Sequence, residues 1–128
     1  MKFRRIAGSG LRPVAFAIAA IALLATSGCH SFHVDATVEN HTGAPIQLLE
    51  VDYPSASFGA DKLAADGVFH YRIQVRGSGS LKVQYTTADE RQVQIAGPEL
   101  AERQEGTLRI ELLPGGKAAF APQLTPRP

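Results

Sequence analysis

The sequence predicts an all-β domain, built as a two-sheet antiparallel sandwich of about seven short strands. Apolar and polar residues alternate with period two through most of residues 32–121, which is the pattern of half-buried strands. Clusters of Gly, Pro, Asn, Asp and Ser interrupt this alternation at short, regular intervals, as turns between strands do. No stretch of this range shows the spacing of a substantial helix.

The first two expected strands are residues 32–39 and 46–53, separated by a turn at Asn40–Pro45 in which Gly and Pro act as breakers. In the second strand the alternation changes phase at Leu48-Leu49. A β-bulge explains this change, and a strand buried on both faces is the alternative.

The stretch 54–67 is expected to be the longest connection, with one helical turn over Asp61–Ala65 that Asp61 caps. Other connections are expected at Gly77–Ser80, a flexible hairpin turn, and at Gly97–Gly106, a charged loop. Five more strands alternate in the same way, at residues 69–75, 81–86, 91–96, 107–113 and 117–121. The Pro-rich tail, residues 122–128, is expected to be mobile.

Seven short strands at this spacing resemble the immunoglobulin-like sandwich, and a small β-barrel is the alternative. Only the architecture is implied, because the sequence has one Cys and no Trp and so lacks the Cys–Trp–Cys pattern of true immunoglobulin domains. The order of the strands does not follow from their spacing. The residues expected to point inward are Val34, Val38, Tyr71, Ile73, Val83, Val93, Ile110 and Leu112.

The residues before the domain have the composition of a secretory signal. A basic start with Lys2, Arg4, Arg5 and Arg12 precedes the apolar segment Val14–Ala25. This segment is too short to span a membrane, because a spanning helix takes about 20 apolar residues. The Arg4-Arg5 pair also fits twin-arginine export, and a plain charged start is the simpler interpretation.

The single cysteine ends the stretch Thr26-Ser27-Gly28-Cys29, which resembles the lipobox of bacterial lipoproteins. The resemblance implies that residues 1–28 are removed and that Cys29 becomes the first mature residue and carries acyl chains such as palmitate. Residues 29–31 would then be a short tether between the lipid and the domain. Alternatively, Ala25 and Ser27 suit an ordinary signal peptidase, which would leave a soluble protein with a free thiol.

The residue after the lipidated cysteine helps to sort lipoproteins in cells with two membranes. His30 is not the Asp that commonly retains them in the inner membrane. The resemblance therefore favours the periplasmic face of the outer membrane. Two or more acyl chains hold a protein stably, since each buried CH₂ contributes ~0.8 kcal/mol.

The charge of the mature chain argues against a nucleic-acid partner. Four of the thirteen Lys and Arg residues precede Cys29 and none of the twelve Asp and Glu residues do, which leaves nine basic and twelve acidic groups, formally −3. Nucleic-acid binding needs a basic face.

No motif in the sequence predicts an enzyme or a cofactor. The four histidines are scattered, and the only Met is the initiator, so copper or zinc handling stays an alternative without a clear ligand set. Serines are present, but none lies in a nucleophile motif such as G-x-S-x-G. We therefore expect a non-enzymatic binding or structural module held at a membrane.

The loop Gly97–Gly106 is the candidate surface for another envelope protein. If seven strands simply alternate in direction, this loop faces away from Cys29, whereas an extra strand near residues 55–59 would reverse that placement. Glu99, Glu102 and Glu105 would steer a basic partner toward it. An ordinary solvated loop is the alternative.

Overall fold

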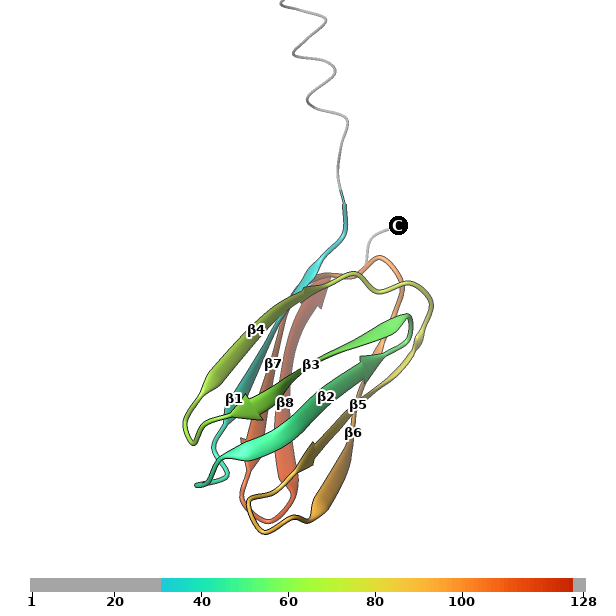
Figure 1. Cartoon of the computed structure of the whole chain (residues 1–128). Coiled ribbons are helices and arrows are strands. Elements are labelled where there is room, and N and C mark those ends of the chain that lie inside the picture. Colours follow the sequence, from blue (N-terminus) through green and yellow to red (C-terminus); the bar gives the residue numbers. More distant parts are fainter. Residues whose placement is uncertain (1–30, 126–128) are drawn as a thin grey trace, which may run out of the picture. The chain divides into compact units, whose positions relative to one another are not determined.

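The computed structural model describes residues 31–125, which form two four-stranded β-sheets packed face to face (Figure 1). This confirms the predicted β-sandwich, and the sheets do not close into a barrel. The described range contains no helix, and therefore none that could cross a membrane. The predicted signal segment, Cys29 and residues 126–128 lie outside the described residues.

The sandwich has eight strands rather than seven. One sheet has the order β4-β1-β7-β8 and the other the order β3-β2-β5-β6. Their bounds are β1 Val34–Asn40, β2 Ile46–Tyr53, β3 Ala56–Leu63, β4 Val68–Ile73, β5 Gly79–Thr86, β6 Gln92–Leu100, β7 Glu105–Leu113 and β8 Lys117–Thr125.

The first sheet is mixed, which corrects the expectation of a purely antiparallel sandwich. β1 lies between β4, to which it is antiparallel, and β7, to which it is parallel, with Val34 opposite both Ile73 and Gly106. Every other strand pair in the described sheets is antiparallel.

The eighth strand was missed because its sequence does not look like a strand. β3 pairs with β2 along almost its whole length, from Ile46 opposite Leu63 to Tyr53 opposite Ala56. It contains Gly, Asp and two Ala residues and lacks a regular alternation of burial, since it is an edge strand. The long connection with a helical turn over Asp61–Ala65 was therefore a wrong prediction.

The bulge predicted at Leu48-Leu49 is confirmed. Leu48 has a positive φ of 51°, and the pairing of β2 with β5 shifts register between Gln47 and Glu50. The bulge turns the Leu48 side chain outward, where it is 64% exposed, and lets Leu49 point into the core.

Two strands run further than expected. β6 reaches Leu100 and β7 begins at Glu105, so the predicted loop Gly97–Gly106 shrinks to residues 101–104. β8 continues to Thr125, so the sandwich does not end at residue 121 and residues 122–125 belong to a strand rather than to a mobile tail.

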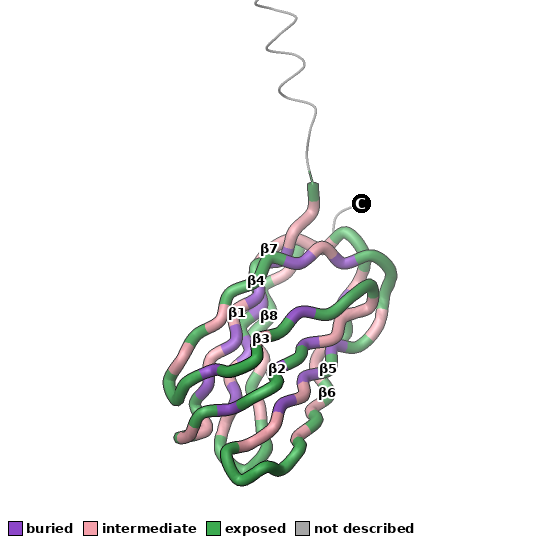
Figure 2. Tube along the Cα trace, viewed as in Figure 1, coloured by how far each residue is buried: buried purple, intermediate pink, exposed green. Residues whose placement is uncertain are grey.

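The core lies between the sheets, and buried residues alternate with more exposed ones along many of the strands (Figure 2). Six of the eight residues expected to point inward are buried: Val34, Val38, Ile73, Val83, Ile110 and Leu112. Val93 is half-buried and packs against the core, while Tyr71 is 46% exposed. Tyr71 lies on the edge strand β4, where an inward ring meets solvent at the open flank of the sandwich.

The even number of strands decides which turns lie together (Figure 1). The start of β1 and the end of β8 lie at one end, which we call the proximal end, together with the turns at residues 54–55, 74–78 and 101–104. The opposite, distal end carries the turns at residues 41–45, 64–67, 87–91 and 114–116.

Asn40 ties two of the distal turns together. This side chain is fully buried at the end of β1. Its Nδ2 donates toward three carbonyl oxygens, those of Ala44 at 2.9 Å, Leu63 at 3.1 Å and Ala64 at 3.0 Å. Its Oδ1 accepts from the backbone N–H of Thr42 at 3.1 Å. A residue that looks like an ordinary turn former is therefore a buried clamp of the distal end.

Candidate functional site

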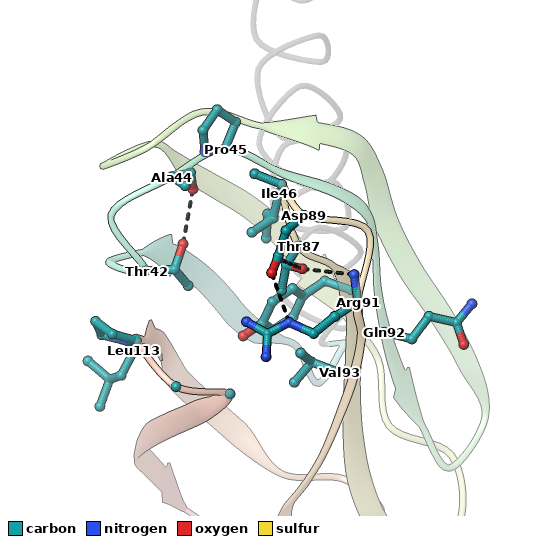
Figure 3. A pocket seen from close by; sticks show the side chains of 15 residues that line it. Thr42, Ala44, Pro45, Ile46, Thr87, Asp89, Arg91, Gln92, Val93 and Leu113 are labelled. Atoms are coloured by element: carbon teal, nitrogen blue, oxygen red, sulfur yellow. Dashed lines mark hydrogen bonds and ion pairs between the residues drawn. The ribbon is translucent and has the colours of Figure 1, made fainter.

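A cavity of about 370 Å³ opens at the distal end, between the turns that join β1 to β2, β5 to β6 and β7 to β8 (Figure 3). Its walls therefore come from both sheets. Its fifteen lining residues are Thr42, Ala44, Pro45, Ile46, Tyr85, Thr87, Ala88, Asp89, Arg91, Gln92, Val93, Leu113, Pro114, Gly115 and Gly116.

The floor of the cavity is apolar, with one polar group. Ile46 is buried there, and Val93 and Leu113 are half-buried. Tyr85 is only 3% exposed, and its burial raises the pKa of its hydroxyl. The Tyr85 hydroxyl forms no hydrogen bond within residues 31–125, whereas every wholly buried side-chain nitrogen or oxygen in that range does. The hydroxyl oxygen is therefore not wholly buried. Because Tyr85 lines the cavity, this oxygen is available to a bound molecule.

One rim of the cavity is the tight turn between β5 and β6. Thr87 Oγ1 donates to Asp89 Oδ1 at 2.5 Å and accepts from the backbone N–H of Arg91 at 3.0 Å. The bond from Thr87 is the main reason that the pKa of Asp89 is lowered. Arg91 Nε lies 3.0 Å from Asp89 Oδ2, so the two charges on this rim are paired (Figure 3).

The opposite rim is the turn between β1 and β2. Thr42 Oγ1 lies 2.7 Å from Asn40 Oδ1 and 3.0 Å from the carbonyl oxygen of Ala44. Since Asn40 is itself fixed by the turn between β3 and β4, this rim is anchored in the core. Both rims are thus ordered before anything binds.

These groups offer apolar contact on the floor and hydrogen bonding at the rim. Paired charges leave the cavity close to neutral, so it does not favour a highly charged ligand. A partner segment that inserts an apolar side chain and presents backbone or hydroxyl groups to the rim fits this arrangement.

The acidic residues expected to form a partner surface do not lie at this end. Glu99 on β6 accepts a hydrogen bond from Ser80 Oγ at 2.6 Å, Glu102 is exposed in the loop 101–104, and Glu105 is half-buried on β7. In that loop the guanidinium of Arg103 lies 5.9 Å from the ring centroid of Phe32, just before β1. The expectation that this loop faces away from the start of β1 was therefore wrong, because the eighth strand reverses it.

The histidines that the structure describes lie on separate parts of the domain. His41 Nε2 lies 3.0 Å from Glu39 Oε1, and His70 Nδ1 lies 3.1 Å from Thr37 Oγ1, both on exposed surface. Across residues 31–125, no three His, Cys, Asp or Glu side chains are placed to hold one metal ion.

Sequence reasoning missed the distal cavity altogether. Its residues come from turns that are far apart in the chain, and which turns share an end depends on the number of strands. The one usable signal was the inward position of Tyr85 at the end of a strand, since a buried tyrosine normally needs a partner for its hydroxyl.

No protein-family model and no curated protein sequence matches this chain. Among solved structures, the NMR structure of a protein from Eubacterium rectale is similar, with a TM-score of 0.52 and 12% sequence identity. The similarity covers 70% of this chain and 86% of that protein. At such low identity the likeness shows a shared fold alone, and that fold is the β-sandwich described above.

Proposed function

We propose that this protein is a lipid-anchored envelope lipoprotein whose β-sandwich is a non-enzymatic binding module for another envelope protein. One observation carries the proposal: the lipobox-like stretch Thr26–Cys29 immediately precedes the compact unit that begins at Phe32. The periplasmic face of the outer membrane is the location that His30 favours.

The short tether orients the domain. Cys29 is three residues before Phe32, so at ~3.4 Å per residue the sandwich begins within about 10 Å of the acyl chains. The proximal end then lies against the membrane. The distal cavity faces away from it, because β1 carries the chain roughly 20 Å further at ~3.3 Å per residue.

The distal cavity supports a protein partner over a small charged molecule. Its charged side chains are paired with each other, and its floor combines apolar side chains with the free hydroxyl of Tyr85. An apolar side chain of a partner loop would fill the floor, while the loop backbone would bond to the rim. Among residues 31–125, no group of three metal-ligating side chains supports the alternative of metal handling.

Anchoring is tested with the variant Cys29→Ser. We expect it to lose metabolic labelling with palmitate and to leave the membrane fraction, because the acyl chains have no other attachment point in this proposal. Persistent labelling of the variant would show that the lipid is attached elsewhere or that the protein is not a lipoprotein of this kind.

Binding at the distal end is tested by photo-crosslinking in intact cells. A photoreactive residue placed at Ala88 on the cavity rim should give a discrete adduct, and the same residue at Ser78 in a proximal turn is the matched control. Val93→Phe, which fills the cavity floor, should abolish the adduct while the melting temperature stays close to that of the parent. An adduct that forms equally from both positions, or that survives the filled cavity, would contradict a partner at this site.

A further inference from the structure

A second cavity, of about 400 Å³, lies at the proximal end between the turn that joins β2 to β3 and the strand β4. It is lined by His33, Tyr53, Ser55, Ala56, Tyr71, Arg72, Gln74 and Arg76. Two of these residues are arginines, one is a histidine and none is acidic. Residues 31–125 as a whole contain twelve Asp and Glu against eight Lys and Arg, so an acid-free cavity on this domain is suited to an anion.

Arg76 is the cation that this cavity leaves available. Its Nη2 donates to Gln74 Oε1 at 3.1 Å, and its backbone N–H donates to Ser55 Oγ at 3.2 Å. Ser55 Oγ in turn donates to the carbonyl oxygen of Gln74 at 3.2 Å, so the turns on both sides of the cavity are joined. Within the described part of the chain, Arg76 forms no ion pair with a carboxylate.

Arg72 adds a second cation that can be shared. Its Nε lies 3.1 Å from Asp35 Oδ1, and both side chains are more than half exposed. Exposed pairs of this kind contribute little stability, so the guanidinium can turn toward a bound anion at small cost. A guanidinium is well shaped to hold a phosphate through two parallel hydrogen bonds.

Two tyrosines complete the cavity and are held in place by packing. The Tyr71 ring stacks on Phe58 with centroids 4.8 Å apart and an angle of 7° between the rings. The ring centroids of Tyr53 and Phe58 are 6.2 Å apart. Burial is the main cause that raises the pKa of the Tyr53 hydroxyl. Tyrosine beside arginine is the combination found where a protein meets the headgroup layer of a bilayer.

We infer that the proximal cavity binds the phosphate of an anionic phospholipid in the membrane that holds the protein. This inference rests on the proposed lipid anchor, since His33 of the cavity lies four residues after Cys29. The acyl chains would hold the cavity at headgroup level, and the bound phosphate would fix the rotation of the domain about its tether. The distal cavity would then face outward in one defined orientation.

The test uses the mature chain without its lipid, so that its outcome does not depend on acylation. The chain from residue 29 onward, carrying Cys29→Ser, is floated with vesicles of phosphatidylcholine alone or with 30 mol% phosphatidylglycerol. We expect binding only to the anionic vesicles. Arg76→Gln should weaken it about five-fold, and Arg72→Gln together with Arg76→Gln should abolish measurable binding. Lys117→Gln, at the exposed start of β8 at the distal end, makes the same change of charge and should leave binding unchanged.

Three results would overturn the inference. The first is an absence of binding to anionic vesicles, and the second is an equal loss of binding with Lys117→Gln, which would show attraction by overall charge alone. The third is an NMR titration in which inorganic phosphate alone shifts the signals of the cavity residues as strongly as anionic vesicles do. That result would indicate a site for free phosphate. Loss of the palmitate label in Cys29→Ser is read out separately, so failure of the anchor and failure of this cavity are distinguished.

Discussion

Asn40→Asp should be among the most damaging single changes in this domain, although it alters the size of the side chain very little. Asn40 is fully buried, and its Nδ2 faces three carbonyl oxygens at 2.9 to 3.1 Å. The substitution replaces that donor with a carboxylate oxygen, so attraction becomes repulsion at each of these contacts. Lost hydrogen bonds at ~1 kcal/mol each and an unpaired buried charge together predict a loss of about 4 kcal/mol.

Measuring the free energy of unfolding at two pH values separates the cost of the charge from the cost of the lost hydrogen bonds. The introduced carboxyl would have a folded pKa above its unfolded value of ~3.9, because burial and the three carbonyls disfavour its charged form. The penalty for charge is therefore full at neutral pH and disappears as pH falls below the unfolded pKa. Asn40→Ala removes the same bonds without adding a charge, so it serves as the matched control with little pH dependence.

Urea unfolding followed by circular dichroism at pH 7 and pH 4 provides the measurement. We expect the gap between Asn40→Asp and Asn40→Ala to narrow at the lower pH. A loss below about 1 kcal/mol for Asn40→Asp at pH 7, or a gap that widens on acidification, would refute the clamp as described.

Two further predictions concern the sheets. A Cβ at Gly59 would collide with the carbonyl oxygen of Leu49 in the bulge, so Gly59→Ala should lower the free energy of unfolding in urea by ~1–3 kcal/mol. Gly79→Ala is the control and should cost much less, because its Cβ would lie 3.5 Å from the Pro54 ring. Equal costs would show that the bulge does not restrict position 59. The pKa of Glu39 is lowered to about 2, mainly by its hydrogen bond from Arg109. The ionised carboxylate therefore stabilises the fold above the unfolded pKa of about 4.5, and this contribution is lost as pH falls from 4.5 to 2. Glu39→Gln should destabilise the domain at pH 7 and not at pH 2, and an effect independent of pH would exclude this linkage.

Most of the fold could be predicted from the alternation of apolar residues, because a half-buried strand must show it. The same pattern even located the bulge, since Leu48-Leu49 breaks the period by one residue. It failed at β3, an edge strand whose backbone pairs with β2 although its side chains bury little surface. It also overstated the burial of Tyr71, because alternation indicates which way a side chain points and not whether another strand covers it.

The site was harder to predict than the fold for a related physical reason. Each strand reverses the chain, so one missed strand moves every later turn to the other end. This is why the acidic loop was expected at the end of the molecule where the Tyr85 cavity lies. Lipidation, in contrast, depends on a local peptide read before folding, so Thr26–Cys29 could support an expectation without any knowledge of the sheets.

The central position of β1 has a consequence for the order of events during synthesis. A chain made from its N-terminus releases β1 first, yet its partners are β4 and the much later β7, so Val34 must wait for both Ile73 and Gly106. The first sheet therefore cannot form until most of the chain has emerged, and its long-range pairings make its assembly slow. The second sheet needs no residue beyond Leu100 and contains the neighbouring pairs β2–β3 and β5–β6, so it can be complete while β1 still lacks β7.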